Sequence, residues 1–90
     1  MINWDQRKRQ ANLKKHGFDF VDANEVFDGV TFTYEDDRIA YGEKRFVTLG
    51  LLRGIIVSIV HTEQDDHIRV ISMPKATKYE REIYFQNISN

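Results

Sequence analysis

The chain has 90 residues, enough for one domain with a single modest core, so we expect residues 1–90 to build any functional site from one sheet and its flanking helices. Its composition, 41% hydrophobic and 30% charged, is ordinary for a soluble globular protein, and the absence of cysteine excludes disulfides, thiolate nucleophiles and cysteine-based zinc sites. No apolar signal region opens the chain and no apolar run reaches the roughly 20 residues of a membrane helix, so we expect a cytoplasmic protein with no membrane partner.

The net charge of −1 conceals a segregation of charge along the chain. Residues 1–18 carry five basic side chains and one acidic side chain, whereas residues 19–37 carry seven acidic side chains and no basic one. A basic surface can contact nucleic acid phosphates, and an acidic surface can contact a basic partner. The alternative is that each cluster is only a solvated helix face.

The N-terminal third predicts a short strand followed by two helices. Residues 1–5 are expected to form an edge strand. Residues 6–16 are good helix formers throughout, with Asp5 placed to cap the helix and Gly17 placed to end it. A second, shorter helix is predicted over residues 19–27, capped by its first residue, and its apolar stripe is expected to pack in the core.

The middle of the chain predicts a sheet. Residues 55–60 are a β-branched run with apolar side chains on both alternating faces, as expected of a strand that is covered on both sides. Short connections to the neighbouring strands predict an antiparallel meander. The other strands are expected over residues 30–34, 46–52 and 68–72, with turns at residues 35–37, 53–54 and 63–66.

The C-terminal residues predict one more helix. Thr77 and Glu80 have the spacing of a capping box and open a helix that runs to about residue 88, and Pro74 separates this helix from the last strand. Residues 38–44 are expected to be a loop with a bend at Gly42. The predicted fold is therefore α+β, with N-terminal helices and a C-terminal helix packed on an antiparallel sheet of about four strands.

The first helix carries a polar face that is a candidate ligand surface. Lys8, Asn12 and Lys15 recur at intervals of four and three residues, which places them on one face, with His16 beside them in the last turn. We expect this face to contact a ligand because the helix has little apolar content to bury. The alternative is a solvent-facing helix whose terminal Lys15 and His16 only complement its dipole.

These residues belong to a longer pattern that resembles the BrnT family over nearly the whole chain. The pattern is Trp4-Asp5-x-x-Lys8-x-x-x-Asn12-x-x-Lys15-His16-Gly17, then Phe20, Ala23, Val26 and Phe27, then Gly42-Glu43-x-Arg45, Ile68-Arg69-Val70-Ile71-Ser72 and Lys75-Ala76-Thr77-x-x-Glu80. The resemblance implies a small ribonuclease with a RelE-like fold, the toxin of a bacterial type II toxin–antitoxin system. It also implies neutralisation by a BrnA-like antitoxin that binds operator DNA.

RNA cleavage without a metal ion requires a base for the 2′-hydroxyl proton, a cation beside the phosphate oxygens and an acid for the leaving 5′-oxygen. His16 and His61 can titrate near neutral pH, and Glu43 and Glu80 are alternative bases. Positive charge can come from several side chains, of which arginine is the better bidentate phosphate holder. We predict that His16, Arg45, Arg69, Lys75 and Glu80 are catalytic and that Lys8, Asn12, Lys15 and His61 bind RNA. No acidic pair indicates a two-metal nuclease, so we expect no metal or cofactor and activity that survives EDTA.

Some of these residues also have a structural interpretation. Glu80 fits the capping box as well as it fits catalysis. His61 continues the apolar face of the central strand and is either a hydrogen-bonded core residue or a residue at the rim of that strand. Arg69 shares its strand face with Ile71, so its charge must meet a carboxylate or a phosphate.

Two positions depart from the family pattern and predict attenuated activity. Pro74 stands where family members commonly have an arginine, and Gln64 replaces another arginine that is frequent in the turn. Lys75 could substitute as a point charge, but a lysine cannot hold two phosphate oxygens as arginine does.

Two functions remain open on this basis. The first is an endoribonuclease toxin that halts growth and is neutralised by its partner; the second is a cleavage-deficient module that keeps only the antitoxin interface. DNA binding by the isolated chain is disfavoured by its slight acidity, so DNA contact is expected through the antitoxin alone. An exposed sheet edge predicts a dimer or a hetero-oligomer with the antitoxin.

Overall fold

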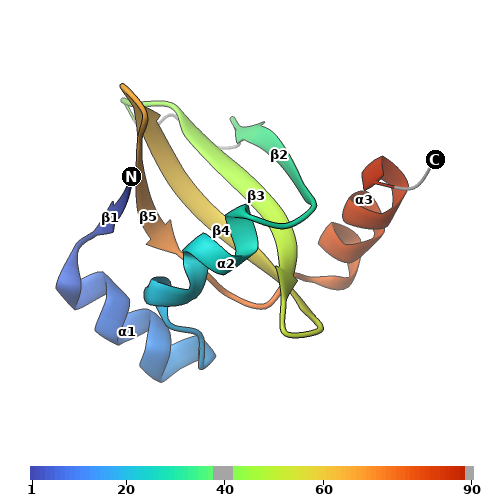
Figure 1. The fold of residues 1–90 in the computed structure, drawn as a ribbon, viewed down its shortest axis with the longest axis horizontal. Coiled ribbons are helices and arrows are strands. Elements are labelled where there is room, and N and C mark those ends of the chain that lie inside the picture. Colours follow the sequence, from blue (N-terminus) through green and yellow to red (C-terminus); the bar gives the residue numbers. More distant parts are fainter. Residues whose placement is uncertain (38–41, 89–90) are drawn as a thin grey trace.

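A computed structural model of the chain describes residues 1–37 and 42–88 as one five-stranded sheet with helices on both faces (Figure 1). The strand order is β1-β5-β4-β3-β2, with β1 parallel to β5 and the other neighbours antiparallel. None of the helices in the described ranges is long and apolar enough to cross a membrane. The elements are β1 (Ile2–Trp4), α1 (Gln6–His16), the 3₁₀ helix η1 (Phe20–Asp22), α2 (Ala23–Phe27), β2 (Thr31–Asp36), β3 (Arg45–Leu52), β4 (Ile55–Gln64), β5 (His67–Ser72) and α3 (Lys78–Ile88).

The prediction of a four-stranded antiparallel sheet is wrong in one respect. The predicted N-terminal edge strand is confirmed, but β1 is a fifth strand of the same sheet and pairs in parallel with β5, through Ile2 opposite Ile68 and Trp4 opposite Val70. The predicted meander is confirmed. Its hairpins close with Arg53-Gly54 and Asp65-Asp66, all four residues having positive φ, as a two-residue hairpin turn of this type requires.

The face of the sheet toward α1 and α2 holds the larger core. Fully buried side chains of η1 and α2 (Phe20, Ala23, Val26) pack on Ile59 and Val70. Helix α2 approaches β3 so closely that a Cβ atom on Gly50 would lie 2.7 Å from a methyl group of Val26, which explains the glycine inside a strand.

The opposite face carries α3. Tyr84 is fully buried among Val47, Leu49 and Ile56, and its hydroxyl donates a 2.8 Å hydrogen bond to the Val30 carbonyl. Helix α3 packs mainly on β2 and β3, so it covers one part of this face and leaves β5 outside that core.

Local signals at the helix ends are confirmed. The Asp5 carboxylate accepts from the Arg7 and Lys8 amides, and Gly17 ends α1 with φ 80°. The predicted capping box is also present: the Thr77 amide donates to the Glu80 carboxylate at 2.8 Å, and the Glu80 amide donates to the Thr77 hydroxyl at 3.1 Å.

Three predicted boundaries differ from the structure. The single helix over residues 19–27 is η1 followed by α2, because the Asp22 amide bonds the Asp19 carbonyl three residues back and the first turn winds tighter. The predicted turn at 35–37 starts later, since Glu35 and Asp36 continue β2, with Asp36 opposite Arg45. The predicted turn at 63–66 shrinks to two residues. Of the loop predicted over residues 38–44, Gly42 has φ 79°, and residues 38–41 lie outside the described residues.

Candidate functional site

Helix α1 is held against the sheet by one buried amide. Asn12 is 6% exposed, and its side chain bonds both the amide and the carbonyl of Met73, at 2.9 and 3.0 Å, and the Phe18 carbonyl at 3.0 Å. Asn12 thus joins α1 to the residue that follows β5. Its amide is engaged within the protein, and its predicted contact with RNA stays a prediction.

The neighbouring residues on the same helix form a shallow basic groove. Lys8, Lys15 and His16 line a groove of about 270 Å³ whose other wall is Ile71 and Ser72 at the end of β5. Lys8, Lys15 and His16 are exposed. Asn12 also borders this groove, so the structure brings together four of the predicted site residues at the junction of α1 and β5, and we call this surface the α1 groove.

Arg45 and Arg69 lie in a row across the sheet. Arg69 of β5 is paired with Thr62 of β4. On its other side, β4 pairs with β3 through His61 and Phe46. The next residue on each strand places Thr62 opposite Arg45. Paired residues share a face of the sheet, so Arg45, Thr62 and Arg69 all project on the α3 side. The two arginines are thus two strands apart, about 9–10 Å between backbones, a spacing that long side chains can bridge around one anion.

The α1 groove lies a short way along β5 from this row. Ile71, which lines the α1 groove, is two residues from Arg69, but it stands at a β-bulge where the pairing with β4 shifts from Val70–His61 to Ser72–Val60. Strand alternation therefore does not carry from Arg69 to Ile71, and the α1 groove and the arginine row are neighbouring but separate basic surfaces. We call Arg45 and Arg69 the arginine row.

Glu43 provides the carboxylate that Arg69 contacts. The Arg69 guanidinium lies 3.4 Å from a Glu43 carboxylate oxygen, and both side chains are about half exposed. A single long contact at the surface contributes little stability and leaves the other guanidinium N–H groups facing solvent. Sequence reasoning treated Glu43 only as an alternative base and missed its position beside Arg69, because this contact joins residues 26 apart.

Glu80 has a structural role that accounts for both its oxygens. One oxygen accepts from the Thr77 amide in the capping box, and the other accepts from the Ser58 hydroxyl of β4 at 2.9 Å. Glu80 therefore fastens the start of α3 to the central strand. Its predicted catalytic role is not tested by this geometry, but a base at this position would first have to release these hydrogen bonds.

The structure separates Lys75 from the arginine row. Lys75 forms an isolated bridge with Val57, and Val57 belongs to the core beneath α1 and α2. Bridge partners share a face, so the exposed Lys75 leaves the sheet on the face opposite Arg45 and Arg69.

His61 lies in the interior rather than at the rim of its strand. It has no exposed surface, its Nε2 is 2.8 Å from the Thr48 hydroxyl, and its ring contacts the rings of Phe27 and Phe46. Its Nδ1 lies 3.7 Å from a Glu63 oxygen and has no hydrogen-bond partner within residues 1–37 and 42–88. Burial lowers the pKa of His61, because the charged imidazolium loses water, and the nearby Glu63 carboxylate opposes this shift. The structure supports the core interpretation of His61, and its predicted RNA contact would need the surrounding rings to move.

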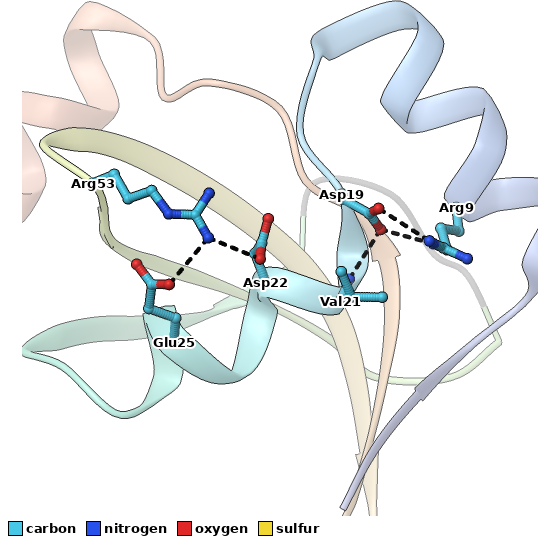
Figure 2. Close-up of polar contacts among 6 residues, drawn as sticks. All are labelled: Arg9, Asp19, Val21, Asp22, Glu25 and Arg53. Atoms are coloured by element: carbon cyan, nitrogen blue, oxygen red, sulfur yellow. Dashed lines mark hydrogen bonds and ion pairs between the residues drawn. The ribbon is translucent and has the colours of Figure 1, made fainter.

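Other charged residues on the α1 and α2 side are engaged with each other (Figure 2). Arg9 donates two hydrogen bonds to Asp19, at 2.7 and 3.1 Å, and these bonds lower the pKa of the Asp19 carboxyl. Arg53, at the β3–β4 turn, reaches Asp22 at 3.0 Å and Glu25 at 3.2 Å. In the described part of the chain, no three His, Asp or Glu side chains lie close enough together to hold a metal ion.

The fold and these surfaces define a small α+β protein with a basic groove beside α1 and a row of two arginines on the α3 side of its sheet. The model of the BrnT family, ribonuclease toxins of type II toxin–antitoxin systems, matches residues 4–80. Because the match spans most of the chain, the chain belongs to this family of ribonuclease toxins. No match was found among curated proteins.

Proposed function

We propose that this chain is a metal-independent endoribonuclease toxin that cleaves RNA across the arginine row. The observation that carries the proposal is the placement of Arg45 and Arg69 in one row on the α3 side of the sheet, with Arg69 on β5, outside the core that α3 covers. Arginine holds phosphate oxygens bidentately, and two guanidinium groups can neutralise the charge that develops on a phosphorane.

The α1 groove would hold the flanking RNA backbone. Lys8 and Lys15 are exposed point charges beside Ile71, which lies two residues along β5 from Arg69. Lysine contacts with phosphate contribute affinity without reading sequence, so RNA would cross from α1 over β5 toward β3.

The proposed reaction is an internal transesterification. The 2′-hydroxyl oxygen attacks the adjacent phosphorus and loses its proton to a base, the bond between phosphorus and O5′ breaks, and O5′ takes a proton from an acid. The products are a 2′,3′-cyclic phosphate and a 5′-hydroxyl. We propose Glu43, beside Arg69, and His16, in the α1 groove, for the two proton transfers. Glu80 would position α3, and Lys75, on the opposite face, would assist from outside the centre.

Incubation of the purified, partner-free protein with total RNA in EDTA tests the proposal. We expect fragments that end in a cyclic phosphate, undiminished cleavage in EDTA, and loss of cleavage in His16→Ala. His67→Ala is the matched control, because His67 is an exposed histidine in the β4–β5 hairpin, away from α1. Lys75→Ala is expected to keep most activity, and a complete loss in that variant would move the centre to the opposite face.

If the folded parent cuts no RNA, the chain is a binding module that has lost cleavage. Pro74 and Gln64, which replace arginines common in the family pattern, favour this second function. Both functions include neutralisation by a BrnA-like antitoxin in the cytoplasm, with DNA contact through that antitoxin and assembly as a dimer or hetero-oligomer. Growth arrest on expression, relieved by co-expression of the antitoxin, would support the first function only.

A further inference from the structure

The arginine row is part of a longer row that crosses all five strands of the sheet. Asn3 of β1 is paired with Arg69 of β5, so the row continues past Arg69 to the first strand. At the other end, Asp36 of β2 is paired with Arg45 of β3. Each strand thus contributes one side chain to the same face, in the order Asn3, Arg69, Thr62, Arg45 and Asp36, and we call these five residues the cross-sheet row.

Packing on the opposite face shows where two of these side chains point. Trp4 packs against the core beneath α1 and α2, and His61 contacts the ring of Phe27 in α2. Because side chains alternate along a strand, Asn3, next to Trp4, and Thr62, next to His61, leave the sheet on the α3 side. Helix α3 itself packs on β2 and β3, at the far end of the strand order from β1 (Figure 1).

Exposure falls along the cross-sheet row from one edge of the sheet to the other. Asn3 and Arg69 are exposed, Thr62 and Arg45 are half-buried, and Asp36 is 5% exposed. The row is therefore open at β1 and closed at β2. Phosphate is attracted to the two arginines and repelled by a carboxylate, so the charges also favour the part of the row from Asn3 to Arg45 for an RNA backbone. This part spans three strand spacings, about 14 Å.

Thr62 occupies the centre of that open part. It lies one strand from each arginine, with about 4.8 Å between neighbouring backbones. Other threonine hydroxyls serve the fold: Thr33 and Thr48 bond each other at 2.7 Å, and Thr77 accepts from the Glu80 amide at 3.1 Å. Within residues 1–37 and 42–88, the Thr62 hydroxyl has no hydrogen bond to another residue, so it is available to donate to a ligand.

Asn3 is the outermost residue of the row. Asparagine is depleted in strands, and edge strands commonly carry charged side chains, so strand formation does not explain an exposed asparagine here. Its amide both donates and accepts, and it carries no charge that would repel phosphate. Strand β1 leads into α1 through Asp5, so Asn3 lies between the arginine row and the basic helix.

We propose that Thr62 and Asn3 are further RNA-binding residues and that RNA lies along the cross-sheet row. The Thr62 hydroxyl donates to an oxygen of the phosphate that Arg45 and Arg69 hold, as a third donor between two guanidinium groups. The Asn3 amide bonds the next nucleotide toward the open edge. The proposal rests on the proposed function, because it takes the arginine row as the place where the phosphate binds.

Binding of an uncleavable RNA tests the Thr62 contact apart from cleavage. A short RNA with 2′-fluoro riboses lacks the attacking hydroxyl, so its dissociation constant reports binding contacts alone. Thr62→Val removes the hydroxyl and Thr62→Ser keeps it. Thr31→Val is the matched control, because Thr31 is a half-buried threonine of β2 that lies opposite Gly50, on the face covered by α2. We expect Thr62→Val to bind about five- to tenfold more weakly, and Thr62→Ser and Thr31→Val to bind within about twofold of the parent.

Asn3→Ala tests the open end of the row. We expect about threefold weaker binding of the same RNA, while Asn24→Ala, which changes an exposed asparagine of α2, keeps the affinity of the parent. Amide chemical shifts of the unmodified chain give a readout that needs no variant to fold. On RNA addition they are expected to change at Asn3, Thr62 and Arg69 and to stay constant at Thr31.

Four results would overturn the proposal: no RNA binding by the unmodified chain, parent-like binding by Thr62→Val, equal weakening in Thr31→Val, or shifts confined to other surfaces. Parent-like binding by Asn3→Ala would overturn the path beyond Arg69. Cleavage of ordinary RNA is measured separately, so the two ideas fail independently. A chain that cuts RNA equally well without the Thr62 hydroxyl and the Asn3 amide refutes only this RNA path, whereas a chain that binds the uncleavable RNA along the row but cuts none refutes only the proposed activity.

Discussion

Arg53 and Arg69 are both exposed arginines, yet they lie in opposite electrostatic settings. Arg53, on the side of α1 and α2, has 64% of its side chain exposed and bonds two carboxylates at 3.0 and 3.2 Å. Arg69, on the other side, is 51% exposed and has one contact, at 3.4 Å. On the first side Arg53 joins the β3–β4 turn to two carboxylates of η1 and α2, whereas on the second side Arg69 makes one long contact with Glu43. The same residue type is therefore held more firmly on one face than on the other.

Replacement of each arginine by alanine should separate these roles. We expect Arg69→Ala to lose about 10²–10³ in RNA cleavage rate, the usual loss for a group that stabilises developing charge, with an unchanged midpoint of thermal unfolding. Arg53→Ala should keep its cleavage rate and unfold at a lower temperature, because Asp22 and Glu25 lose their shared partner. Initial rates on a short RNA and thermal melts of both variants give the comparison. Equal losses of cleavage rate in Arg69→Ala and Arg53→Ala would show that the two faces do not differ in their role in cleavage.

The Asn12 amide should show the largest effect on stability. In Asn12→Ala the buried amide and carbonyl of Met73 lose their partners, and each unsatisfied buried group costs about 1–3 kcal/mol, so we expect a loss of about 3 kcal/mol in the free energy of unfolding. Asn24→Ala is the matched control, because Asn24 is exposed on α2. Urea unfolding of both variants measures the difference, and a near-neutral Asn12→Ala would mean that α1 is held by other contacts.

The sequence predicted best those features that depend on neighbouring residues, such as helix bounds and caps. The bounds of α1, its Asp5 cap and its end at Gly17 depend on residues within a few positions, and all are confirmed. The parallel pairing of β1 with β5 joins residues that are 66 positions apart in the sequence. Strand β1 has only three residues, too few for a hydrophobic pattern that would indicate its partner strand. Asp36 looked like part of a turn because its place opposite Arg45 is visible only in the folded sheet.

The candidate site was predicted in the same uneven way. Helical spacing placed Lys8 and Lys15 together with His16, and the structure confirms that grouping. Alternation along one strand predicted Arg69 and Ile71 on one face, but a β-bulge at Ile71 interrupts that alternation, and the place of Arg45 beside Arg69 depends on the register of three strands. It also could not tell that His61 is enclosed by Phe27 and Phe46.

The burial of His61 predicts a dependence of stability on pH. Its folded pKa is lowered, so the unfolded chain binds a proton near pH 6.5 while the folded chain does not. Stability is then fully present above pH 6.5 and falls as the pH drops toward the folded pKa, by at most about 1.4 kcal/mol per pH unit. Urea unfolding between pH 5 and 8 should show this slope in the parent and not in His61→Gln, which keeps a polar atom for Thr48. Equal slopes would contradict a neutral, buried His61.

The Arg9–Asp19 pair should give the smallest effect and a different pH window. Asp19 accepts from the Val21 amide as the cap of η1 as well as from Arg9, so Asp19→Ala removes a cap, worth about 1 kcal/mol, together with the ion pair. Arg9→Ala removes only the half-buried ion pair and should cost less, and its effect should shrink in high salt. The lowered pKa of Asp19 means that its contribution is present above the ordinary carboxyl pKa, near 3.8, and is lost as the pH falls below it. A double-mutant cycle in urea at two salt concentrations measures both parts. If Arg9→Ala cost as much as Asp19→Ala at high salt, the ion pair rather than the cap would hold η1 in place.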